Sequence, residues 1–152
     1  MKNLVMTIVA ASFLGVSPVT GHADGAIKAA QPYQPIAVAR TINSLRRSVG
    51  LRPIQRSPRA DAAARRHAAD MARHGFFSHR GSDGSTHSVR LRSAGCRGGA
   101  ENIASGPYTR RSVLKAWVNS PGHRRNIMLP AVRSFGMAQV GNKWVMVLSA
   151  GC

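Results

Sequence analysis

A chain of 152 residues, 43% of them hydrophobic, suits one domain with an ordinary core, and this composition excludes a disordered protein. Twenty-two lysines and arginines stand against five acidic residues, and the formal net charge of +17 favours anionic partners such as lipids or cell-envelope polymers. The arginines are spread along the chain and aromatic residues make up only 5% of it, whereas nucleic-acid binders tend to interleave a basic stripe with aromatic residues. We therefore expect no nucleic-acid partner.

The first 23 residues have the layout of a secretory signal peptide. Lys2 precedes an apolar run, Leu4 to Val16, and the small-residue sequence Gly21-His22-Ala23 offers a cleavage site. The apolar run has about 13 residues, fewer than the ~20 of a membrane-spanning helix, so an uncleaved anchor is the less favoured alternative. We expect residues 1–23 to be removed and residues 24–35 to be a flexible lead-in. The mature protein is then secreted or periplasmic and not integral to the membrane.

Cys96 and Cys152 are the two cysteines of the chain. In an oxidising compartment a lone pair of cysteines usually forms one disulfide, so we predict a bridge between them. A metal site built on the pair is disfavoured, because neither cysteine has a Cys or His nearby at ligand spacing.

Three segments show apolar side chains at the spacing of an amphipathic helix: 36–49, 61–74 and 110–119. Gly50 and Gly75 are placed to end the first two. Short helices are predicted between Ser85 and Gly95 and after Pro121, since proline suits the first turn of a helix. Between the first two helices, the sequence indicates an extended piece.

Strands are predicted late in the chain. Residues 135–140 and 144–149 are strand-like, and Gly141-Asn142 is a turn dipeptide, which together predict a hairpin. Residues 98–107 are predicted to be a loop with a short extended segment at 102–104. Helices followed by antiparallel strands predict an α+β domain over residues 36–152, with helices packed on a small sheet.

Four stretches form an ordered pattern: His67 to Met71 with Phe77-Ser78-His79, Gly81-Ser82-Asp83-Gly84 with Arg90, Ala100 to Gly106, and Trp117 to Ile127. The set resembles the bacterial members of the CAP superfamily, which comprises cysteine-rich secretory proteins, antigen 5 and pathogenesis-related proteins. The match spans about residues 36–152. It implies an exported α-β-α sandwich with a central cleft that holds histidines and acidic residues.

The resemblance implies that His79, His123 and Glu101 lie in this cleft. The family's fuller set has a second glutamate three residues after the helix tryptophan, and Ser120 stands there in this chain. Asn102 and Ser120 are expected to line the cleft, although Asn102 has the alternative of bonding nearby backbone. Two imidazoles and a carboxylate suit a divalent metal, zinc first, with His79 and His123 as ligands.

Several of these residues also have a purely structural interpretation. Glu101 is the only glutamate of the chain, and its alternative role, in place of a cleft residue, is to cap a turn or to pair with an arginine. His67 lies on the apolar stripe of its helix and is predicted to be a hydrogen-bonded core residue. His74 suits a helix C-terminus through the helix dipole, and His87 opens a short helix.

Three functions from different classes remain open. The favoured one is an exported binding module for a lipid, a cell-envelope component or a peptide. The second is a metal-assisted, peptidase-like hydrolase with Glu101 as general base, against which the serine at position 120 counts. The third is a stress or surface-interaction protein that works through its positive charge. The sequence does not assign an oligomeric state.

Overall fold

The computed structural model describes residues 35–152, which belong to one compact unit, Pro32–Cys152. The expected signal peptide, residues 1–23, and the lead-in up to residue 34 lie outside the described residues. In chain order the described elements are α1 (Pro35–Arg47), β1 (Gln55–Arg56), α2 (Pro58–His74), α3 (His87–Ser93), β2 (Arg97–Ser105), α4 (Arg110–Asn119), α5 (Pro121–Ile127), β3 (Ser134–Val140) and β4 (Lys143–Gly151).

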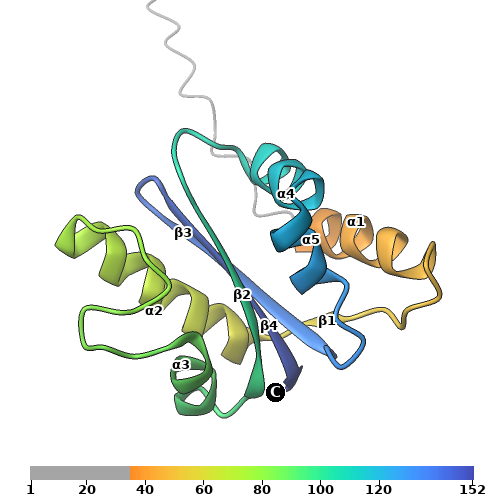
Figure 1. Ribbon diagram of the computed structural model, residues 1–152, viewed down its shortest axis with the longest axis horizontal. Coiled ribbons are helices and arrows are strands. Elements are labelled where there is room, and N and C mark those ends of the chain that lie inside the picture. The colour runs from red at the N-terminus through yellow and green to blue at the C-terminus, as the bar shows by residue number, and fades with distance from the viewer. Residues whose placement is uncertain (1–34) are drawn as a thin grey trace, which may run out of the picture. The chain divides into compact units, whose positions relative to one another are not determined.

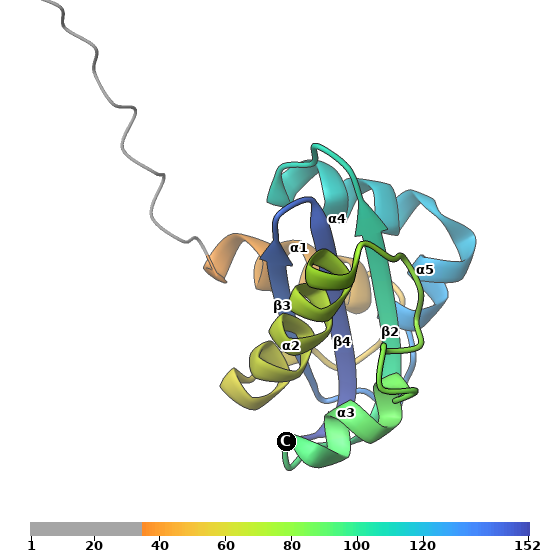
Figure 2. The same ribbon diagram turned by 90° about the vertical axis from the view of Figure 1, so that its left-hand side faces the viewer.

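The elements form three layers, with one sheet between two layers of helices (Figure 1). Figure 2 shows α2 and α3 in front of the sheet and α1, α4 and α5 behind it, and each helical layer shares a separate apolar core with the sheet. The strand order is β1-β3-β4-β2, so β2 is an edge strand. This arrangement confirms the predicted α+β class and the α-β-α sandwich.

The predicted C-terminal hairpin is present as β3 and β4, which pair antiparallel. Gly141 in its two-residue turn has a φ of +55°, a conformation that favours glycine. The extended piece between α1 and α2 contains β1, which pairs parallel with β3 at two positions. Apart from this short strand, the sheet is antiparallel, as predicted.

The extended segment predicted at 102–104 is present, but the loop predicted around it was wrong, because β2 is a nine-residue strand. It pairs antiparallel with β4 along its length, including Glu101 opposite Val147. Two adjacent glycines, Gly98 and Gly99, lower the intrinsic strand preference and concealed the strand in the sequence. The structure explains Gly99 differently, since a Cβ at this position would collide with the backbone carbonyl of Leu148 on β4.

The two cores meet the sheet on alternate residues, as the two-residue period of a strand requires. On β4, Trp144, Met146 and Leu148 join the core under α1, α4 and α5, while Val145 and Val147 join the core under α2 and α3. The face of α2 that meets the sheet consists largely of buried alanines, which let the helix approach closely: Ala60, Ala63, Ala64 and Ala68. At Gly136 of β3 a Cβ would collide with the α2 backbone, so the sheet and the helix are in backbone contact there.

Helix ends follow the predicted capping signals with small shifts. Helix α2 begins at Pro58, three residues before the predicted start, with Ser57 as its N-cap, and ends at Gly75 with a φ of +69°. Helix α1 ends at Arg47, so Val49 is 55% exposed and is not the core residue that its spacing predicted. Arg46 is fully buried instead, and its guanidinium donates hydrogen bonds to the carbonyls of Arg52, Ile127 and Leu129.

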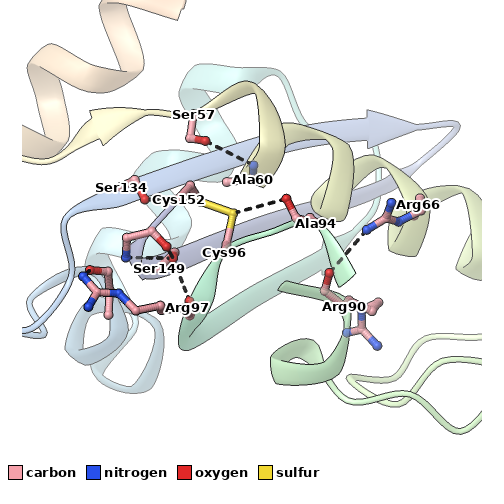
Figure 3. The surroundings of a disulfide bond; sticks show 12 residues. Ser57, Ala60, Arg66, Arg90, Ala94, Cys96, Arg97, Ser134, Ser149 and Cys152 are labelled. Atoms are coloured by element: carbon pink, nitrogen blue, oxygen red, sulfur yellow. Dashed lines mark hydrogen bonds between the residues drawn. A yellow bond between two sulfur atoms is a disulfide. The ribbon is translucent and has the colours of Figure 1, made fainter. Parts of the chain in front are cut away.

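The predicted disulfide between Cys96 and Cys152 is confirmed (Figure 3). Arg97 and Gly151, the neighbours of the two cysteines, are the last residue pair of the β2–β4 ladder. The bridge therefore closes one end of this ladder and ties the last residue of the chain to the start of β2. Among the residues that the structure describes, no helix has both the length and the apolar character needed to cross a membrane.

Candidate functional site

The candidate site lies at the free edge of the sheet, on strand β2. Successive side chains of this strand point to opposite faces, so Ile103 packs in the core with α2 and Ala100 in the core with α4 and α5. Glu101 therefore faces the α2 layer and Asn102 faces the α5 layer. Because β2 has a strand neighbour on one side only, residues from both helical layers contact it here.

Glu101 is the centre of the site, and its side chain is 0% exposed. One carboxylate oxygen lies 2.9 Å from Nδ1 of His79, and the other accepts a hydrogen bond of 2.8 Å from Nη2 of Arg90. Nε2 of His67 lies 3.8 Å from the carboxylate. A carboxylate at this depth requires such partners, because an uncompensated buried charge is strongly unfavourable.

Arg90, at 7% exposed, joins this carboxylate to the loop that carries His79. Its guanidinium also donates to the carbonyls of His79, at 3.0 Å, and Ser85, at 2.8 Å. Helix α3 positions Arg90 from its N-cap, Thr86, whose hydroxyl accepts from the third residue of the helix. The sequence analysis gave pairing with an arginine as the alternative role of Glu101, and this pairing is present. It did not identify Arg90 as the partner, and the one available signal was the place of Arg90 in the matching stretches.

His79 lies in the loop after α2, and its side chain is 55% exposed. Its Nδ1 faces the Glu101 carboxylate, which accepts a hydrogen bond only from a protonated nitrogen. The neutral ring therefore carries its proton on Nδ1 and leaves the lone pair of Nε2 free. This arrangement gives His79 one nitrogen for Glu101 and one for a ligand.

His123 belongs to the other helical layer, in the first turn of α5. Its Nδ1 lies 3.0 Å from the hydroxyl of Ser120, the residue at the position of the family's second glutamate. Burial lowers the pKa of His123 below its ordinary value, and the nearby charge of His79 lowers it further. His79 contacts Glu101 and the backbone carbonyl of His123 accepts from Asn102, so the two histidines belong to opposite helical layers and flank adjacent residues of β2.

Asn102 is fully buried and connects β2 to α5. Its Nδ2 donates to the backbone carbonyl of His123 at 3.1 Å, and its Oδ1 accepts from Asn126 at 2.8 Å. Asn126 also donates to the backbone carbonyl of Glu101. This amide network fixes α5, and with it His123, against the strand that carries Glu101.

The other histidines have separate roles. His67 is a buried core residue as predicted, and its Nε2–H donates to the carbonyl of Ser78 at 2.8 Å. Burial lowers the pKa of His67 in spite of the attraction of Glu101, which lies beside it. His74 pairs with Asp70 at 2.9 Å, and His87 bonds the carbonyl of Gly99. The proximity of His67 to Glu101 was not predicted.

The donor set limits how a metal would be held. No cluster of three or more His, Cys, Asp or Glu side chains within residues 35–152 is arranged to hold a metal ion. His79 and His123 each use Nδ1 for a hydrogen bond, and within residues 35–152 neither Nε2 has a hydrogen-bond partner. Glu101 stands behind His79 as its hydrogen-bond partner. Any metal at this site would have two imidazole nitrogens as its protein ligands, with the Glu101 carboxylate behind one of the rings.

The fold and the site together define a three-layer domain whose edge strand carries a buried glutamate between two histidine-bearing segments. The sequence model of the cysteine-rich secretory protein family (CAP) matches residues 39–147. The chain belongs to this family.

A sequence relative is the uncharacterized protein YkwD of Bacillus subtilis, 33% identical over 111 residues, a match that covers 70% of this chain and 43% of YkwD. Similar solved structures include an extracellular protein with an SCP domain from Bacillus anthracis, with a TM-score of 0.68 and 23% identity over 74% of this chain and 39% of that one. An outer surface protein from Borrelia burgdorferi has a TM-score of 0.65 and 20% identity, over 76% of this chain and 91% of that one. The chain thus spans less than half of the first two relatives.

Proposed function

We propose that the protein is an exported binding module whose site at β2 holds a divalent metal, zinc first, between His79 and His123. The ligand is a lipid, a cell-envelope component or a peptide. One observation carries the metal proposal: both imidazoles engage Nδ1, with Glu101 and Ser120 respectively, and neither Nε2 has a hydrogen-bond partner within residues 35–152. Bound at these nitrogens, zinc would act as a Lewis acid with open coordination positions for a ligand or solvent.

The surroundings of the two imidazoles support the proposal. When one ring nitrogen of a histidine binds a metal, a carboxylate that accepts a hydrogen bond from the other ring nitrogen orients the ring and raises its basicity. Glu101 is placed to do this for His79. A lowered pKa keeps His123 neutral at pH 7, and imidazole binds metal only in its neutral form. Both effects favour metal binding at neutral pH.

The contacts of Glu101 favour binding over metal-assisted hydrolysis. A general base must reach a water molecule at the reacting centre. Both oxygens of Glu101 are already within hydrogen-bond distance of protein partners, and its side chain is fully buried. Ser120 offers a hydroxyl in place of a second carboxylate.

Export is supported by three observations. The sequence begins with the layout of a signal peptide, the two cysteines form a disulfide, and one structural neighbour is described as extracellular. A protein in this compartment meets lipids, envelope polymers and peptides, which are the ligand classes proposed here.

Zinc titration by calorimetry tests the proposal. We expect weak binding by the wild type, and loss of binding in His79→Ala and in His123→Ala. Glu101→Gln should weaken binding by about tenfold or more, because an amide is a poorer partner for the His79 ring. His87→Ala is the matched control and should bind as the wild type does. Equal zinc affinity in the wild type and in the His79→Ala/His123→Ala double variant would refute the metal site.

A further inference from the structure

A groove separate from the His79 and His123 nitrogens lies between α2, the loop after it, and α3. Its cavity of about 630 Å³ is lined on the α2 side by Arg65, Arg66 and Arg73 and on the α3 side by Arg90. Arg66 donates to the carbonyl of Arg90 at 3.3 Å, which links the two helices across one end of the groove (Figure 3).

The groove has an excess of positive charge. Arg90 is paired with Glu101, so the charges that the groove presents are those of Arg65, Arg66 and Arg73 against those of Asp70 and Asp83, a net formal charge of +1. Both aspartates are already engaged by the loop between α2 and α3, Asp70 by the backbone and side chain of Ser82 and Asp83 by the backbone of Ser85. Arg65 and Arg73 are exposed, and within residues 35–152 neither side chain makes a hydrogen bond or an ion pair.

We propose that this groove binds a phosphomonoester, carried either by a small molecule or by a lipid headgroup. A phosphomonoester has a charge of about −1.5 to −2 at pH 7, opposite in sign to the net charge of the lining. Guanidinium groups bind phosphate oxygens through paired, charge-assisted hydrogen bonds, and the three arginines of α2 present such groups.

The spacing along α2 indicates where the anion binds. Arg66 and Arg73 are seven residues apart and so share one face of the helix, about 10 Å apart along its axis. Arg65 lies next to Arg66, so two of the three exposed guanidiniums are at the end of the groove where α2 and α3 are linked. We place the phosphate at that end. Pockets of about 300–1,000 Å³ take small organic ligands, so the volume leaves room for the body that carries the phosphate.

The groove shares its floor with the site at β2 but not its ligand atoms. His67 and Arg90 line the groove, and both lie beside Glu101 on their other side. Within residues 35–152, no hydrogen bond or ion pair joins Arg65, Arg66 or Arg73 to His79 or His123. Binding in the groove is therefore independent of metal, and its failure would leave the proposed metal site untouched.

The test is binding of sn-glycerol 3-phosphate to the exported protein in the presence of EDTA. Binding is measured by amide NMR shifts and by calorimetry. We expect shifts confined to residues 65–73 and 82–93. The variant Arg65→Gln/Arg66→Gln/Arg73→Gln should lose about tenfold or more in affinity. The control Arg40→Gln/Arg47→Gln/Arg111→Gln removes the same charge from α1 and α4, on the other helical layer, and should lose less than about twofold if the site is local.

Two further binding measurements identify the chemical group that the groove recognises and the kind of molecule that carries it. Succinate has a similar charge but no phosphate, and it should bind much more weakly. Vesicles of phosphatidylcholine with phosphatidic acid present the same phosphomonoester on a membrane. Binding of these vesicles without binding of the free ester, abolished by the α2 triple variant, assigns the site to a lipid headgroup. Equal losses in both triple variants, equal binding of succinate, or no binding of either probe would overturn the proposal.

Discussion

Removing the positive charge of Arg90 is the sharpest test of how the site is built. The substitution Arg90→Met keeps much of the length of the side chain but removes the guanidinium that donates to the Glu101 carboxylate at 2.8 Å. The Glu101 side chain is 0% exposed, so its charge then stays buried without this partner. Breaking a buried ion pair on one side costs about 3–5 kcal/mol, because the remaining charge stays buried. We expect the free energy of unfolding to fall by this amount.

Urea denaturation followed by circular dichroism measures the effect, with Arg92→Met as the matched control. Arg92 lies on the same helix but is exposed, so its loss should change stability by less than about 0.5 kcal/mol. Adding Glu101→Gln to Arg90→Met removes the stranded charge and should recover part of the loss. A cost below about 1 kcal/mol for Arg90→Met, or a double variant no more stable than the single one, would refute the reasoning.

Three further predictions follow from the fold and the site. The bridge closes a loop with a sequence separation of 56, worth about 4 kcal/mol by loop entropy, so Cys96→Ser should lower the thermal midpoint clearly, and unreduced protein should show no reactive thiol. Gly136→Ala should destabilise the domain because its Cβ would collide with the α2 backbone at Ala60, whereas Gly122→Ala, with open space around it, should not. The pKa of His123, followed by NMR, should lie below its ordinary value and rise in His79→Ala. A folded pKa below the unfolded one means that the unfolded chain binds more protons, so the His123 contribution to stability should fall as pH drops below about 6.5. An unchanged midpoint, equal effects of the two glycine substitutions, or a His123 pKa indifferent to His79 would contradict these statements in turn.

The sequence alone determined the features that depend on neighbouring residues. The apolar spacing and the capping residues placed the helices to within a few residues, and Gly141-Asn142 placed the hairpin. Two cysteines in a chain with the layout of a signal peptide predicted the single disulfide. The ordered motifs identified the family, which carries the fold with it. In each case the signal is local or is a property of the whole composition.

Only the tertiary structure decided which polar residues are buried and what they contact. Most of strand β2 was not predicted because its glycines weaken the local signal, and the strand exists through its pairing with β4, a segment far along the chain. Arg46 and Arg90 have the same local signature as the exposed arginines, yet both are buried because carbonyls or a carboxylate from distant segments surround them. His67 likewise meets Glu101 only when α2 packs on the sheet. A side chain's periodicity shows on which face it lies, but its chemical partner depends on which segment packs against that face, and this is decided by contacts far apart in the sequence.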